Sequence, residues 1–135
     1  MLFLSISLVA CEKETIIDED KLPDEIKTFV STHFPDKKIL QSVKEFDDFS
    51  TSYRVILEGN YQLVFDHKKE IEEIEGIEKL PDSVIPVKIL DYVSANYPAN
   101  YIIKWNKEKT HQEVVLGNRL ELEFNNDGDF LRIDN

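Results

Sequence analysis

The sequence LPDEIKTFVSTHFP at residues 22–35 and the sequence IPVKILDYVSANYP at residues 85–98 decide the fold, because they are two copies of one pattern. In each copy a Pro at the second position opens an apolar stripe with helical i, i+3, i+4, i+8 spacing, and a second Pro closes it. The stripes consist of Ile26, Phe29, Val30 and Phe34 in the first copy and Ile89, Tyr92, Val93 and Tyr97 in the second, each pair 63 positions apart (89 − 26). The spacing predicts a helix over residues 23–34 and a second helix that starts at either Asp82 or Pro86. A repeat of this length indicates two copies of one supersecondary unit.

Strand-like alternation follows each predicted helix. An extended segment comes first, at residues 38–46 and 101–107, and a hairpin with a Gly/Asn turn comes next, at residues 53–66 and 114–124. The segment 70–75 could be helical when taken alone. Its counterpart, 129–134, follows the strong turn Asn-Asp-Gly at 126–128, so we predict strands for both. The predicted fold class is therefore α+β, with two tandem α-β-β-β-β repeats, an antiparallel sheet or pair of sheets, and both helices packed on one face.

The N-terminal residues point to export. Residues 1–10 are uncharged and almost entirely apolar, too short to span a bilayer but suited to a lipoprotein-type signal peptide. Leu8-Val9-Ala10-Cys11 resembles the lipobox of bacterial lipoproteins, which implies cleavage before Cys11 and attachment of lipid to its thiol. No Lys or Arg precedes the apolar run, and an upstream start would explain this departure. The alternative is a buried N-terminal strand with a free thiol.

These assignments divide the chain into three parts. Residues 1–10 are the signal peptide, residues 11–21 are the lipidated Cys11 and a flexible acidic tether, and residues 22–135 are a single domain. The domain contains repeat 1 (22–79) and repeat 2 (80–135), each too small to be more than marginally stable alone. Cys11 is the only cysteine, so the mature domain has no internal disulfide.

The charge balance excludes some partners. With 27 acidic and 16 basic residues the formal net charge is −11, which argues against binding to nucleic acid and against a polybasic surface that binds membranes.

The lipobox sets the expected location. We expect a monomeric domain held at the membrane through lipid on Cys11. This places it in the bacterial cell envelope on the outer membrane, either on its periplasmic side or at the cell surface.

The tandem helix-plus-four-strand unit resembles the PepSY-like family, which is related in fold to the beta-lactamase inhibitory protein. The resemblance rests on the two Pro-bounded helices, on Tyr-x-Val-x-Leu at 53–57 and on Leu-x-Phe-Asp at 63–66, and it covers residues 22–135. It implies helices on one side of the sheet and an open opposite face for a partner. Lys69 departs from the pattern, because a turn glycine is expected at this position and Gly128 supplies it at the equivalent position in copy two. The resemblance carries no catalytic residue.

Strand alternation assigns a set of side chains to the open face as a candidate binding surface. The set is Arg54, Ile56, Val64, Ile103, Trp105, Val115, Glu121 and Glu123. Exposed Trp residues are good interface anchors. The alternative for Trp105 is a structural role, covering the sheet edge or the junction between the repeats.

The sequence contains no recognisable catalytic or metal-binding pattern. His33, His67 and His111 have no metal-ligand spacing, and the sequence contains neither a Gly-rich phosphate loop nor a nucleophile elbow. Residues 125–129 read as a hairpin turn rather than a calcium loop. The sequence therefore predicts a non-enzymatic envelope lipoprotein, without cofactor or metal, that binds an envelope protein or peptide. Inhibition of an enzyme is the sharpest form of this hypothesis. The alternative is a sensor module that binds a small molecule or a cation.

Overall fold

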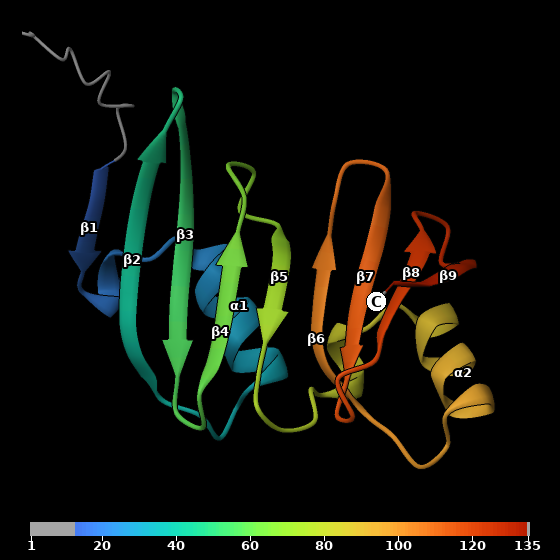
Figure 1. Cartoon of the computed structure of the whole chain (residues 1–135). Helices are drawn as coiled ribbons and strands as arrows, with labels where there is room; N and C mark the ends of the chain where they lie inside the picture. The colour runs from blue at the N-terminus through green and yellow to red at the C-terminus, as the bar shows by residue number, and fades with distance from the viewer. Residues whose placement is uncertain (1–12, 135) are drawn as a thin grey trace, which may run out of the picture.

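A computed structural model describes residues 13–134 of the chain, and these residues form an α+β fold (Figure 1). The elements are β1 (Lys13–Ile17), η1 (Glu19–Lys21), α1 (Asp24–His33), β2 (Ile39–Asp47), β3 (Ser50–Leu57), β4 (Tyr61–Phe65), β5 (Ile71–Glu75), η2 (Asp82–Val84), α2 (Val87–Asn96), β6 (Ile102–Lys107), β7 (His111–Leu116), β8 (Glu121–Asn125) and β9 (Phe130–Asp134). The order α1-β2-β3-β4-β5 followed by α2-β6-β7-β8-β9 confirms the predicted tandem repeat. Residues 70–75 and 129–134 both contribute strands, as their equivalence predicted.

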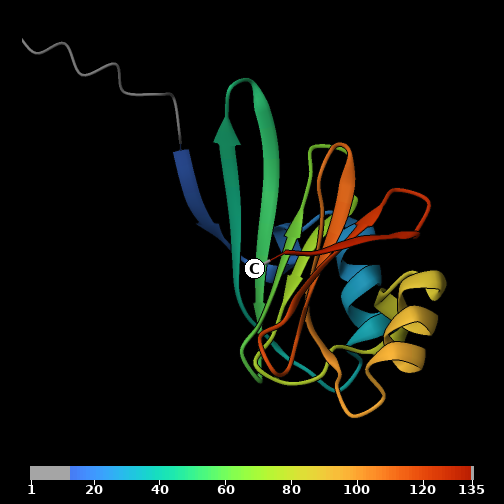
Figure 2. The same ribbon diagram turned by 45° about the vertical axis from the view of Figure 1, so that its right-hand side comes forward.

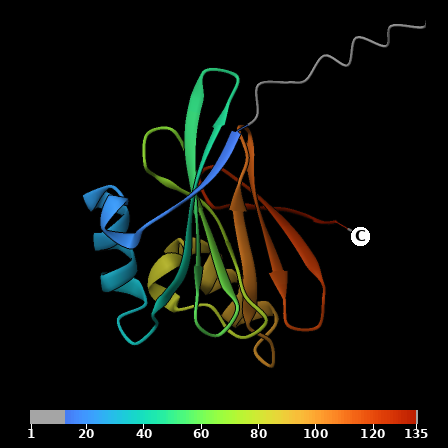
Figure 3. The ribbon, with the colours of Figure 1, turned by 90° about the vertical axis from the view of Figure 1, so that its left-hand side faces the viewer.

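The strands form one continuous sheet in which each strand pairs antiparallel with its neighbour in the chain, from β1 to β9. The repeats join where β5 pairs with β6 over three residue pairs, of which Ile74 opposite Trp105 is the central one. Both helices lie on the same side of this sheet, as Figures 2 and 3 show from two directions. The opposite face is covered by no helix of the described chain.

Each helix is bounded as the proline positions predicted. Pro23 and Pro86 immediately precede α1 and α2, and each helix ends where the backbone N–H of an aromatic residue, Phe34 or Tyr97, donates to a carbonyl four residues earlier. The two possible starts of the second helix both have a structural basis. The first is the short 3₁₀ turn η2, which begins at Asp82, and the second is α2 itself.

The core lies between the helices and the sheet, and it runs without a break through both repeats. Ile26 and Val30 of α1 and Ile89 and Val93 of α2 are buried against it. The strands contribute alternate residues, as predicted, except in β6, where the two core residues Ile102 and Trp105 are three residues apart. The core residues of the strands are Val55, Leu57, Tyr61, Leu63, Phe65 and Ile74 in repeat 1 and Ile102, Trp105, Val114, Leu116, Leu122 and Phe124 in repeat 2.

The prediction of a flexible tether is wrong for residues 13–17, which form β1 and pair with β2 from Lys13 opposite Phe46 to Ile17 opposite Ser42. The outer edge of β2 would otherwise expose a row of unpaired backbone groups, and an added strand satisfies them. Ile17 also packs against the core. The sheet therefore has nine strands, one more than the eight that the two predicted four-strand repeats provide. The lipobox and Cys11 lie outside the described residues.

The turn before β5 shows how Lys69 replaces a glycine. Lys69 and Gly128 both have positive φ, +66° and +91°, so the two turns have the same left-handed backbone. In the first turn the Asp66 carboxylate accepts hydrogen bonds from the backbone N–H groups of Lys68 and Glu70. Asn125 does the same for Asp127 and Asp129 in the second. An acidic or amide side chain holds each turn, so residues 125–129 form a hairpin turn, as predicted.

Candidate binding face

The open face begins in repeat 1 with side chains from the paired strands β3 and β4. Arg54 lies opposite Val64, and Ile56 lies opposite Gln62. Their neighbours along the strands, Val55 and Leu63, are buried in the core, so alternation places these four side chains on the side away from the helices. Arg54, Ile56 and Val64 are all partly exposed, and the structure therefore places them on one accessible surface.

Repeat 2 continues this face through β7 and β8. Val115 lies opposite Glu121, and Glu113 lies opposite Glu123. Glu121 is exposed, whereas Glu123 is buried. Ile103 belongs to the same region, because it lines a hollow together with Val115 and Glu121. It is only 3% exposed, so it forms the floor of the hollow rather than a contact surface.

Trp105 does not belong to the open face. It pairs with Ile74 and Val114, which are both in the core, and it is 5% exposed. Its indole N–H donates to the Oε1 atom of Gln112 over 3.0 Å. The cause is a register shift between Ile102 and Lys104, which places both Ile102 and Trp105 on the core side although they are three residues apart. The alternative role at the junction between the repeats is the one that the structure supports.

Ion pairs link the strands across this face. In repeat 1 the Arg54 guanidinium lies 2.9 Å from Glu45 of β2 and 3.7 Å from Glu14 of β1. At the junction the Lys104 ammonium lies 3.1 Å from the Glu73 carboxylate. Burial alone would lower the pKa of Lys104, but the hydrogen bond to Glu73 and the negative charges of nearby carboxylates raise it overall.

A second cluster occupies the far end of the face. The Nη1 atom of Arg132 contacts both carboxylate oxygens of Glu123 at 2.9 Å. The Nε2 atom of His111 lies 3.0 Å from Glu113 and 3.9 Å from Glu123. These contacts explain why a carboxylate as buried as Glu123 is tolerated, since buried charges require partners. Despite these pairs, carboxylates outnumber cations on the face, and Glu75 and Glu121 project into solvent.

Several members of this surface were not predicted from the sequence, namely Glu45, Lys104, His111, Glu113 and Arg132. The signal was present for two of them. In residues 111–115, strict alternation places His111 and Glu113 on the same side as Val115, which had already been assigned to the face. Lys104 could not be assigned in this way, because the register shift that displaces Trp105 is not visible in the sequence.

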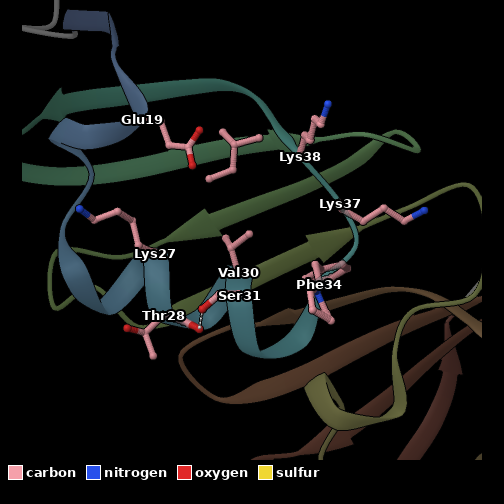
Figure 4. Close-up of a pocket in the computed structure, with 10 residues that line it drawn as sticks. Glu19, Lys27, Thr28, Val30, Ser31, Phe34, Lys37 and Lys38 are labelled. Atoms are coloured by element: carbon pink, nitrogen blue, oxygen red, sulfur yellow. Dashed lines mark hydrogen bonds between the residues drawn. The ribbon is translucent and has the colours of Figure 1, made fainter.

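A cavity of about 580 Å³ lies elsewhere, between α1 and β2 (Figure 4). Val30 and Phe34 form its apolar side, and Lys27, Lys37 and Lys38 lie around it. Figure 4 shows these three ammonium groups pointing away from one another, while Ser31 donates its hydroxyl hydrogen bond to the carbonyl of Thr28. The polar groups do not converge on one point, so the cavity does not define a ligand.

Two further features bear on function. Among residues 13–134, no group of three or more His, Cys, Asp or Glu side chains is arranged to hold a metal ion. In the same part of the chain, neither helix is long and apolar enough to cross a membrane.

Comparison with known proteins identifies relatives of the whole fold. The family described as "Putative beta-lactamase-inhibitor-like, PepSY-like" matches the chain twice, at residues 8–71 and 51–132. No curated protein matches. A "putative calcium-regulated periplasmic protein" from Bacteroides thetaiotaomicron is similar in structure, with a TM-score of 0.85, 32% identity, and coverage of 90% of this chain and 97% of that one.

Two proteins of Bacteroides vulgatus, each described as a "putative periplasmic protein", are also similar in structure. For the first, the TM-score is 0.85 and the identity 35%, covering 91% of this chain and 98% of the other. For the second, which is described as being of unknown function, the TM-score is 0.84 and the identity 31%, covering 91% of this chain and 100% of the other. The agreement extends over nearly the entire length of each relative.

Proposed function

Because the chain belongs to the PepSY-like family of beta-lactamase-inhibitor-like proteins, we propose that it is a non-enzymatic lipoprotein of the bacterial cell envelope that binds a protein or peptide through its open sheet face. The observation that carries the proposal is the face itself. It is a broad surface with no helix over it, in which half-buried Ile56, Val64 and Val115 lie among carboxylates. The periplasmic descriptions of the similar structures support the envelope location.

The chemistry of the face favours a cationic partner. The exposed carboxylates Glu75 and Glu121 lie outside the ion pairs described above, and the aliphatic side chains between the charges offer apolar contact. A partner surface that presents Lys or Arg around aliphatic groups would complement both features. Inhibition of an envelope enzyme is the sharpest form of this proposal, and it agrees with the description of the family.

A cross-linking pull-down from the native envelope tests the proposal. The bait is the chain from residue 12 onward, compared with a Glu75→Lys, Glu121→Lys variant. The control is Asp91→Lys, which reverses an exposed charge on α2, on the opposite side of the sheet. We expect a specific partner that the double variant loses and the control keeps. A partner indifferent to the double variant would place the binding surface elsewhere.

Anchoring is tested separately by replacing Cys11. The Cys11→Ala chain should move from the membrane fraction to the soluble envelope fraction. A multiply acylated Cys anchors stably, whereas the acidic protein without lipid has no charge attraction to an anionic membrane. Unchanged fractionation would contradict lipidation without affecting the binding proposal.

The second candidate, a cation sensor, is favoured by one observation, the description of a similar protein as calcium-regulated. Regulation by calcium does not require binding of calcium, and the described residues hold no metal-type cluster. Calorimetry with calcium, zinc and a cationic peptide distinguishes the candidates. Heat with calcium or zinc alone would favour the sensor, and heat with the peptide alone would favour the binding module.

A further inference from the structure

Strand β9 is the last strand of repeat 2 and forms one edge of the sheet, whereas its equivalent in repeat 1, β5, pairs on both sides. By the repeat, Ile133 in β9 is equivalent to Ile74 in β5, 59 positions earlier (133 − 74). The outer edge of β5 pairs with β6, and Ile74 is 0% exposed. No described strand pairs with the outer edge of β9, and Ile133 is 46% exposed. Figure 2 shows β9 in front of the other strands.

The composition of β9 is unusual for an edge strand. Edge strands are normally protected by charges, but β9 has the sequence FLRID, whereas the paired strand β5 has IEEIE. Leu131 occupies the position of Glu72 and is 43% exposed. The exposed strand is thus more apolar than its equivalent inside the sheet, which suits a strand that receives a partner.

The central residues of β9 are complementary to themselves. Arg132 and Asp134 lie opposite Glu123 and Glu121 and therefore on the open face, while Ile133 lies opposite the buried Leu122 and therefore on the helix side. If a second β9 pairs antiparallel about Ile133, Arg132 of each subunit lies opposite Asp134 of the other, and the two Ile133 side chains meet. Asp134 makes no ion pair among the described residues. Arg132 is 61% exposed and uses only Nη1 toward Glu123, so its other donors are available.

We propose that two copies of the chain form a two-fold dimer by antiparallel pairing of their β9 strands about Ile133. The junction of the repeats has the same pattern, because Lys104 lies opposite Glu75 beside the apolar pair Ile74 and Trp105. A two-fold contact of this kind closes on itself and does not extend into a fibre. This proposal departs from the monomer expected from the sequence, and it is independent of the proposed binding face and of the lipid anchor.

The test is sedimentation equilibrium of the chain from residue 12 onward. This chain contains every described strand and helix, and it lacks Cys11 and therefore any lipid attached there. We expect a concentration-dependent dimer and a loss of about tenfold or more in association constant for Ile133→Lys. Ile16→Lys is the matched control, because Ile16 is a 70% exposed isoleucine on the opposite edge strand. It should leave the dimer unchanged. A wild-type monomer at all concentrations, or a dimer abolished by the control but not by Ile133→Lys, would overturn the proposal.

A mixing experiment tests the register. Asp134→Arg places two Arg residues opposite each other, and Arg132→Asp places two Asp residues opposite each other, so each variant alone should be mainly monomeric. In an equimolar mixture, each cation again lies opposite a carboxylate in the heterodimer, and the dimer should return. Circular dichroism of each variant monitors folding, since Arg132 also binds Glu123. Folded variants that remain monomeric when mixed would exclude this register.

Discussion

At the scale of single residues, Trp105 separates a structural role from a binding role. The only Trp of the chain was predicted for the open face, yet it is buried between Ile74 and Val114 at the junction of the repeats. Its hydrogen bond to Gln112 satisfies the indole N–H inside the core, as buried indoles require.

We therefore predict that Trp105→Ala destabilises the domain by about 3–5 kcal/mol, the usual cost of removing a buried aromatic side chain. Chemical denaturation with circular dichroism measures this loss. Val64→Ala is the comparison, because Val64 is half-buried on the open face and its truncation should cost less. Equal losses would contradict the placement of Trp105.

Glu72 gives a prediction about pH. Burial raises the pKa of Glu72, and the negative charges of Asp66, Glu73 and Glu108 raise it further. The folded protein therefore binds this proton more tightly than the unfolded chain does. The resulting stabilisation is complete below the ordinary carboxylate pKa and disappears as the pH rises through the folded value.

Glu72→Gln should consequently raise the midpoint of thermal unfolding at pH 7, where the wild-type carboxylate is charged among like charges. Below the ordinary pKa of 4.5 the difference should shrink. Thermal unfolding at both pH values provides the measurement. A variant less stable than wild type at pH 7 would mean that the Glu72 charge is favourable.

At the scale of elements, the repeat predicted strands that local pattern alone could not. Residues 70–75 have isoleucines at helical spacing, and only their equivalence to 129–134 indicated a strand. Two features had no such signal. The register shift near Ile103 depends on backbone pairing with β7 rather than on residue type. β1 forms because the edge of β2 is vacant. Its own sequence gives no signal, since four of its five residues are exposed and the repeat contains no counterpart.

β1 can be tested through its two isoleucines. Ile17 packs against the core, whereas Ile16 is 70% exposed. We expect Ile17→Ala to cost about 1–2 kcal/mol of unfolding free energy and Ile16→Ala to change it by no more than about 0.5 kcal/mol. Denaturant titration of both variants measures the difference. The reverse order would mean that β1 presents its other side to the core.

At the scale of the whole molecule, the two repeats are joined into one core. Leu80, Val84 and Ile85 from the connection between them are buried in the cluster that both helices share. The Nδ1 atom of His33 in α1 also lies 2.8 Å from the Ser83 hydroxyl in η2. The sequence predicted both units and their common helix side, but it could not show whether they form one sheet or two, because that depends on three residue pairs between β5 and β6.

The repeats should therefore unfold together. We predict a single calorimetric transition for the chain from residue 12 onward. A fragment of residues 12–79 should be largely unfolded, because it would expose Ile74 and lose the buried connection, and a domain of this size has little stability to spare. Calorimetry and circular dichroism measure the two results. Two separate transitions, or a folded fragment, would show that the repeats are independent.

The attachment of β1 has a mechanical consequence. β1 lies along β2 over five residue pairs, and its first residue, Lys13, is the described residue nearest the N-terminus. The hydrogen bonds of an antiparallel pair run perpendicular to the strands, so tension applied at Lys13 along the strand loads all of them together in shear. Unzipping would break them one at a time. A domain held from its N-terminal side would thus transmit a steady pull directly into its sheet.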